Sequence, residues 1–321
     1  MTSFRSLAVL VALPFGAFAA DPGLLQALMP NAQVVAGLQV ESAKSSLFGQ
    51  YVLSHFSVND TKLEEFTSET GFDPRRDVSE IVVASNWMRN TPDNRWIVAA
   101  HGAFNISKIT GTAQSNGGVI APYMGVNVVT LPASSSAQED IGIAFLDSST
   151  ALVGDVISVK AAIDRKKSNT PVDGAVLVKA QSVSSGKDFW FVTLVPLSNF
   201  SSSIPDPNLS GAMQGNLLAG INQMSGGIRF GDTVTISAEA VTRSEKDAQA
   251  LVDVVKFFAS LVQLNRQKNP AAGQVATLLD TLQTSTSGNV TTISLAIPEQ
   301  QLEQLLNSAH PPPAKAAARI N

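Results

Sequence analysis

The feature that most constrains the fold is a hairpin followed directly by a long helix in the second half of the chain. Residues 224–230 and 233–241 alternate apolar and polar side chains on either side of Gly231-Asp232, which predicts an antiparallel hairpin with a two-residue turn. Ser244 then predicts a helix start, and apolar residues recur at the i, i+3, i+4, i+7 spacing to about Asn265. Because the hairpin has one apolar face to bury, this order predicts a sheet that is covered by helices.

The long helix carries more apolar residues than one face needs. Its main stripe includes Ala248, Leu251 and Val252, whereas Phe257 and Leu264 widen the apolar surface. We therefore expect this helix to be covered on more than one side.

Similar elements recur along the rest of the chain. The predicted fold class is α+β, with antiparallel sheets and helices packed on one face. One interpretation arranges these elements as two similar halves built of hairpin–helix units. Residues 232–240 and 289–297 share a turn, a strand pattern and a following helix, which indicates an internal repeat. Chance likeness between short strands is the alternative, and both interpretations stay open. Other strands are predicted at residues 34–40, 78–84, 96–104, 123–131, 141–146, 150–153, 188–194 and 282–286, and other helices at 41–56, 105–112 and 155–163.

The N-terminus has the parts of a secretion signal. Arg5 gives a positively charged start, and an apolar stretch too short to span a bilayer follows at residues 6–18. Ala17 and Ala19 put small residues at the two positions that a signal peptidase reads, so we predict cleavage before Ala20 and export to the periplasm or the cell exterior. A membrane anchor and a buried first helix are the alternatives, and a proline and a glycine within the stretch disfavour both.

Composition excludes several kinds of chemistry. The chain has 0 Cys, which excludes disulfides, thiolate catalysis, iron–sulfur clusters and a lipid attached at the cleavage site. A formal net charge of −4 without a basic stripe gives no support for nucleic-acid binding. The later part of the chain has no run of about 20 apolar residues, so no integral membrane segment is predicted after signal cleavage. With 44% hydrophobic residues, a sizeable core is expected in a soluble body.

Four parts of the chain are predicted. The polar joint at residues 165–170 is taken as the domain boundary, although an ordinary surface loop explains it equally well. The parts are a signal peptide at residues 1–19, an N-terminal α+β domain at 20–168, a C-terminal α+β domain at 169–309 and a disordered Pro/Ala tail at 310–321.

Motifs for catalysis and cofactors are missing from the sequence. The histidines His55, His101 and His310 are far apart and lack metal-site spacing, so no metal is predicted. No phosphate-binding loop occurs, and the glycine-rich residues 225–231 lead into a strand rather than a helix, so no cofactor is predicted. The Gly-x-Ser-x-Gly elbow of serine hydrolases is also missing, so no catalytic residue is assigned.

The most distinctive polar run lies at residues 71–77. Its arginines Arg75 and Arg76 are candidates for binding an anion or a carboxylate of a partner, and His101 is a further candidate binding residue. Turn formation at Asp73 and local pairing of Arg76 with Asp77 account for the run structurally, and we favour that interpretation.

Several segments of the first half carry a resemblance to known proteins. The segments are Gln33-Val-Val-Ala-Gly-Leu-Gln-Val40, Leu47-Phe-Gly-Gln50, Gly71-Phe-Asp-Pro-Arg-Arg-Asp-Val78, and Phe145-Leu-Asp, Val153-Gly-Asp and Ala161-Ala-Ile-Asp164. They resemble uncharacterised exported α+β proteins of soil bacteria, especially acidobacterial ones. The resemblance implies a periplasmic or secreted protein without an assigned reaction, so it transfers no functional residue.

Two main functional hypotheses follow. The first is a non-enzymatic binding or scaffold protein whose partner is an unknown protein or small-molecule ligand, bound on an open sheet face or in a groove. The alternative is a hydrolase with an unrecognised site, which requires His101 or His55 within hydrogen-bond reach of a serine and an acid. A third hypothesis, an inhibitor or chaperone, uses the loop at residues 198–210.

Overall fold

The structure is a computed structural model of the chain. It describes residues 19–55, 60–88, 91, 93–133, 139–169, 174–196, 220–266 and 270–309. The predicted signal before residue 19, the loop at 198–210 and the tail at 310–321 lie outside the described residues.

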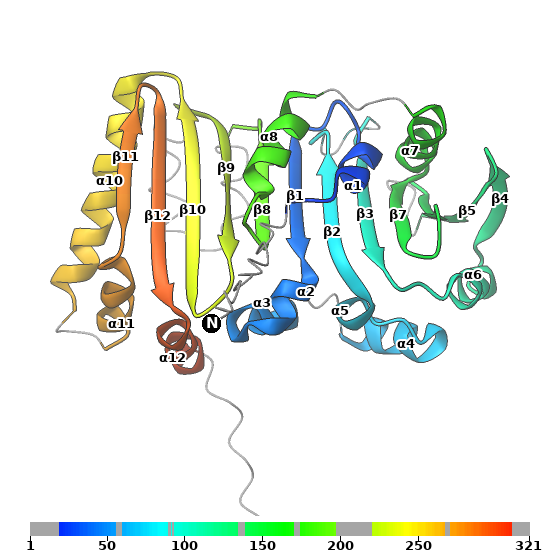
Figure 1. The fold of residues 1–321 in the computed structure, drawn as a ribbon, viewed down its shortest axis with the longest axis horizontal. Helices are drawn as coiled ribbons and strands as arrows, with labels where there is room; N and C mark the ends of the chain where they lie inside the picture. Colours follow the sequence, from blue (N-terminus) through cyan, green and yellow to red (C-terminus); the bar gives the residue numbers. More distant parts are fainter. Residues whose placement is uncertain are drawn as a thin grey trace, which may run out of the picture.

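One antiparallel sheet of 12 strands organises the molecule (Figure 1). The strand order is β11-β12-β10-β9-β8-β1-β2-β3-β7-β6-β5-β4. The predicted α+β class with antiparallel pairing is therefore confirmed. The strands are β1 (Val34–Gln39), β2 (Val78–Ser85), β3 (Trp96–Gly102), β4 (Val119–Tyr123), β5 (Val126–Leu131), β6 (Ile141–Phe145), β7 (Thr150–Asp155), β8 (Phe189–Thr193), β9 (Ile221–Arg229), β10 (Thr233–Thr242), β11 (Gln283–Ser287) and β12 (Val290–Pro298).

The helices lie on the faces of the sheet and at one end of its strands (Figure 1). The group at the strand ends consists of α2 (Val40–Ser45), α3 (Leu47–His55), α4 (Asp60–Thr70), α5 (Pro74–Asp77), α6 (Ile106–Ser115) and α12 (Glu299–Ala309). The others are α1 (Pro22–Ala27), α7 (Val156–Ser168), α8 (Ala175–Ser184), α10 (Glu245–Leu264) and α11 (Pro270–Leu279).

The two ends of the sheet are covered on opposite faces. Phe189, Ile228 and Ile236 are directly paired across β8, β9 and β10 and so share one face, while the neighbouring Trp190 points to the other. Trp190 belongs to the main core with residues of α1, α7 and α8. On β10, Ala240 lies on the face of Ile236 and packs against Leu251 of α10. Each half thus has its own helical cover.

The long helix α10 departs from the sequence expectation. Leu251 is 9% exposed and packs on the sheet, but Phe257 is 60% exposed and Leu264 is 75% exposed. The side of α10 that carries Phe257 and Leu264 is therefore exposed, against the expected second cover, although α11 also contacts this half of the helix. The second apolar side of this helix faces outward because Phe257 and Leu264 lie opposite the stripe that packs on the sheet.

Several element boundaries also differ from the sequence expectation. The helix expected at residues 41–56 is two helices, α2 and α3, separated at Ser46, whose hydroxyl donates to Glu299 at 2.6 Å. The strand expected at 123–131 is the second strand of a hairpin, with positive φ at both Met124 and Gly125 in the turn. Helix α8 was not predicted.

The predicted domain boundary falls at the end of α7. Strand β1 pairs with β8 on the other side of that boundary, so a single sheet runs through both predicted domains. The division into two domains and the internal repeat stay predictions.

Candidate functional site

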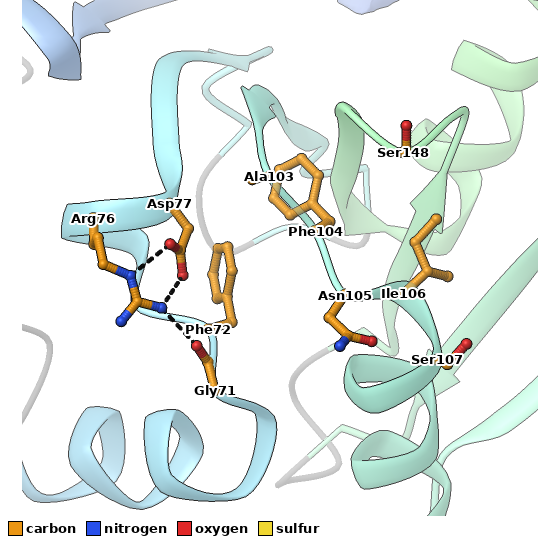
Figure 2. Close-up of a pocket in the computed structure, with 10 residues that line it drawn as sticks. All are labelled: Gly71, Phe72, Arg76, Asp77, Ala103, Phe104, Asn105, Ile106, Ser107 and Ser148. Carbon is orange, nitrogen blue, oxygen red and sulfur yellow. Dashed lines mark hydrogen bonds and ion pairs between the residues drawn. The ribbon is translucent and has the colours of Figure 1, made fainter.

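A cleft of about 660 Å³ opens between the end of α5 and the start of α6 (Figure 2). Its floor is apolar and its rim is polar. The lining residues are Gly71, Phe72, Arg76, Asp77, Ala103, Phe104, Asn105, Ile106, Ser107 and Ser148. The cleft is open to solvent over much of its extent, so a ligand bound there would be only partly enclosed.

Aromatic rings form the floor of the cleft. The centroids of Phe72 and Phe104 lie 5.5 Å apart, and Phe104 lies at the same distance from Phe145 of β6. Phe66 of α4 continues the row with its centroid 6.1 Å from that of Phe72. Ring pairs at these separations attract each other beyond simple burial, so the row holds Phe72 and Phe104 in place.

Backbone contacts fix the segment that carries Phe104. The N–H of Ala103 donates to the carbonyl of Asp77 at 2.8 Å, and the N–H of Gly102 donates to the carbonyl of Ser149 at 3.0 Å. A Cβ on Gly102 would overlap the Asp77 carbonyl oxygen, so only glycine permits this close approach. The loop after β3 is thereby held against α5.

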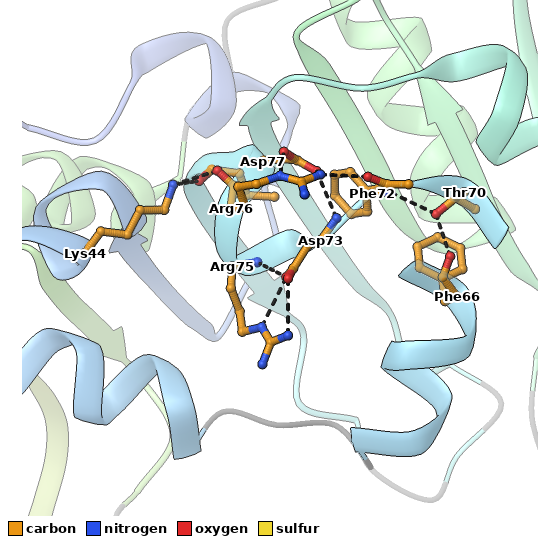
Figure 3. A network of polar contacts seen from close by, with 10 residues as sticks. Lys44, Phe66, Thr70, Phe72, Asp73, Arg75, Arg76 and Asp77 are labelled. Carbon is orange, nitrogen blue, oxygen red and sulfur yellow. Dashed lines mark hydrogen bonds and ion pairs between the residues drawn. The ribbon is translucent and has the colours of Figure 1, made fainter. Parts of the chain in front are cut away.

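Helix α5 begins with its own capping contacts (Figure 3). The Asp73 carboxylate accepts from the backbone N–H of Arg75 at 2.9 Å and from its guanidinium at 3.1 and 3.2 Å. The hydrogen bond from the Arg75 side chain holds the pKa of Asp73 below its usual range. Asp73 and Arg75 are therefore engaged with each other.

Arg76 makes a second local pair at the rim of the cleft (Figure 3). Its guanidinium donates to both carboxylate oxygens of Asp77 at 2.7 Å and to the carbonyl of Gly71 at 2.7 Å. The hydrogen bond from Arg76 lowers the pKa of Asp77, and the same contact raises the pKa of Arg76. The rim therefore carries a neutralised charge pair rather than a free cation.

The other rim of the cleft is the first turn of α6. Asn105 caps this helix by accepting from the N–H of Lys108 at 3.1 Å, and Ser107 follows on the first turn. Asn105 and Ser107 are exposed and line the cleft beside Ile106. They give the site neutral donors and acceptors opposite the Arg76–Asp77 pair (Figure 2).

His101 lies outside this cleft, although it was predicted together with the arginines. Its Nε2 is 3.4 Å from Asp21 Oδ1, and its Nδ1 is 3.2 Å from the carbonyl oxygen of Ser149. The hydroxyl nearest its ring belongs to Thr150, at 3.4 Å, and this buried hydroxyl donates to Asp147. The structure thus brings Arg76 to the cleft, holds Arg75 on Asp73 and places His101 beside α1.

Sequence reasoning missed Phe72, Phe104, Asn105 and Ser107 as parts of one site. The run at 71–77 was noticed for its charges, and Asn105 was assigned only as a helix cap. An aromatic residue at each end of the β2–β3 segment was the available signal, but it went unused, and only strand pairing brings the two rings together.

In the described part of the chain, no group of three or more histidine, aspartate or glutamate residues is placed to hold a metal ion. None of the helices in that part combines the length and apolar character needed to cross a membrane.

Comparison with known proteins shows the fold alone. No protein-family model matches the chain, and no curated protein matches it at a significant level. The solved structure of TP0453 in its crystal form I is similar, with a TM-score of 0.50 and 10% sequence identity. That similarity covers 91% of this chain and 99% of the TP0453 chain.

Proposed function

We propose that this protein is an exported, non-enzymatic binding protein, and that the cleft between α5 and α6 takes a small ligand with a neutral aromatic ring. The observation that carries the proposal is the pair of adjoining, half-buried rings of Phe72 and Phe104 at the floor of the cleft. A ligand ring would extend the existing row of aromatic contacts and remove apolar surface from water.

The rim argues for a neutral ligand over an anion. Arg76 is already bound by both oxygens of Asp77, so a ligand carboxylate would have to compete with a resident carboxylate. A hydroxyl or amide group of the ligand has neutral partners in Asn105 and Ser107 on the opposite rim. The cleft therefore favours a ring that carries a hydroxyl group.

The geometry gives less support to a hydrolase. His101 has an acid nearby in Asp21, but the hydroxyl within reach of its ring is the buried one of Thr150. The Ser149 hydroxyl donates to Asp147 at 2.8 Å instead of facing the imidazole. The side chain of His55 and the loop at 198–210 lie outside the described residues, so the proposal does not use them.

A titration followed by amide NMR tests the proposed site. In the ¹⁵N-labelled chain that starts at Ala20, phenol is expected to shift amides of residues 71–77 and 103–107, and benzoate is expected to shift them less. Phe104→Ala is expected to abolish the phenol shifts. Phe257→Ala is the matched control, since it removes an equally large ring from an exposed helix face. Phenol shifts that persist in folded Phe104→Ala, or that scatter over the molecule, contradict the proposed site.

A further inference from the structure

Glu80 of β2 is a buried carboxylate that has no lysine or arginine partner among the described residues. Glu80 is 8% exposed. It is paired in the sheet with Gln39 of β1 on one side and with His101 of β3 on the other. Its Oε1 accepts from the backbone N–H of Asp21 at 3.0 Å. Among the described residues, none of the ion pairs formed by lysine or arginine includes Glu80.

The electrostatic surroundings of Glu80 are unfavourable for its charge. Burial raises its pKa, and the hydrogen bonds from Asp21 and Gln39 offset only part of that effect. The charged or titratable groups that act on it are Asp21, which raises its pKa further, and His101, which lowers it. A positive charge near this carboxylate would therefore lower the free-energy cost of burying it in its ionised form.

The chain enters the core at this same place. Ala19 is exposed, whereas Ala20 is 2% exposed and belongs to the main hydrophobic cluster. The N–H of Ala20 donates at 3.0 Å to the hydroxyl of Ser184, which is buried in α8 and itself donates to the carbonyl of Gln181. Ser184 is thus oriented to accept from the nitrogen of Ala20.

The nitrogen of Ala20 precedes the nitrogen that already binds Glu80. Because neighbouring residues are at most about 3.8 Å apart along the chain, the nitrogen of Ala20 lies within about 7 Å of Glu80 Oε1. Opposite charges within roughly 4–6 Å favour each other's ionised forms, and this spacing allows such a separation.

We propose that cleavage of the leader before Ala20 creates an α-ammonium group that forms an ion pair with Glu80, so that processing supplies the cation this buried carboxylate lacks. Hydrolysis of the Ala19–Ala20 amide consumes one water, whose hydroxyl ends on the carbonyl carbon of Ala19. The amine of Ala20 leaves with one proton from that water and takes another from solvent to become –NH₃⁺. One N–H of this ammonium group keeps its hydrogen bond to the Ser184 hydroxyl, and the other N–H groups face the Glu80 carboxylate.

This proposal gives the first residue of the processed chain a structural role. A cut one residue later would remove the contact between Ala20 and Ser184. A cut further upstream would leave a neutral amide at Ala20 and place the new charge in solvent, because Ala19 is exposed. The ion pair therefore depends on the site of cleavage as well as on its occurrence.

The first test is the intact mass of the protein recovered from the compartment to which it is exported. The expected mass corresponds to a chain that begins at Ala20. A mass that corresponds to any other first residue overturns the proposal.

The second test is a thermal-unfolding cycle on purified chains. One form starts at Ala20, and the other carries Gly-Ser before Ala20, an extension that exits to solvent as Ala19 does. We expect Glu80→Gln to lower Tm by roughly 5 °C or more in the first form and to leave Tm unchanged or raised in the extended form. Equal effects of Glu80→Gln in both forms overturn the proposal.

Two controls keep this cycle interpretable. Glu239→Gln removes the partner of Lys179 at the surface and is expected to change Tm equally in both forms. If a Glu80→Gln chain does not fold, the reaction of the native α-amine with acetic anhydride replaces the cycle. The amine of Ala20 is expected to react at least tenfold more slowly than in a peptide of the same first residues, and reaction at the peptide's rate overturns the proposal.

Discussion

The indole of Trp190 on β8 occupies the space beside Gly37 of β1 that a Cβ at position 37 would fill. The two residues are directly paired in the sheet, and Trp190 is 1% exposed. This contact lies at the pair of strands that joins the two predicted halves. It explains why a glycine interrupts an otherwise apolar strand at this place.

Replacement of Gly37 tests that contact. Gly37→Ala is expected to lower the free energy of unfolding by about 1–3 kcal/mol, because the new methyl group has to displace a buried indole. Urea unfolding measures the change. Gly111→Ala is the matched control, since a Cβ at that position of α6 meets no neighbour within 4 Å and should leave stability unchanged or raise it by about 0.5–1 kcal/mol. Equal losses in both variants would contradict the account.

The two apolar sides of α10 predict different losses of stability when a leucine side chain is truncated. Leu251→Ala is expected to cost about 2–5 kcal/mol of unfolding free energy because Leu251 packs between α10 and the sheet. Leu264→Ala, at the exposed end of the same helix, should stay within about 0.5 kcal/mol of the original protein. Chemical unfolding of both variants checks this, and a large loss at Leu264 would show that its side is covered in solution.

Asp155 joins β7, β3 and α7 through one buried carboxylate. It accepts from the N–H of Ser158 at 2.8 Å, from the Ser158 hydroxyl at 2.7 Å and from the N–H of Trp96 at 2.9 Å. Asp155→Ala is expected to cost about 2–4 kcal/mol, since it leaves buried donors without a partner. Asn105→Ala removes an exposed cap with a single such bond and should cost about 1 kcal/mol. Similar losses measured by calorimetry would count against this ranking.

The Arg76–Asp77 pair predicts a defined pH dependence. Its hydrogen bonds lower the pKa of Asp77 in the folded protein below the unfolded value. The stability that this group contributes is therefore present above the unfolded pKa and is lost as pH falls through the lowered folded pKa, in the window below about pH 4. Arg76→Gln should move the pKa of Asp77 upward, toward the ordinary range for aspartate. A carboxyl ¹³C titration by NMR measures the shift, and an unchanged pKa would show that Arg76 is not its cause.

Sequence patterns predicted much of the sheet because strand alternation and turn residues are local signals. The hairpin around Gly231-Asp232, the cap at Ser244 and the strands at 78–84 and 96–104 are confirmed. The turn at Met124 was missed, since methionine rarely adopts the positive φ that it has there. The opposite covering of the two halves depends on strand order, which local patterns do not encode.

The candidate site was less predictable than the fold. The pairing of Arg76 with Asp77 was expected from adjacent charges and is confirmed. The contact of Phe72 with Phe104 joins residues that lie before β2 and after β3, and it required the register of those two strands. In the same way, the approach of Asp21 to Glu80 arises only when α1 packs across the sheet.

A crystal of the chain that starts at Ala20, soaked in phenol, tests the proposed binding cleft most directly. The proposal predicts electron density for a ring against Phe72 and Phe104, with its hydroxyl on the side of Asn105 and Ser107. Phenol rings bound at other surfaces of the molecule, with none at this cleft while it is open to solvent in the crystal, would contradict it.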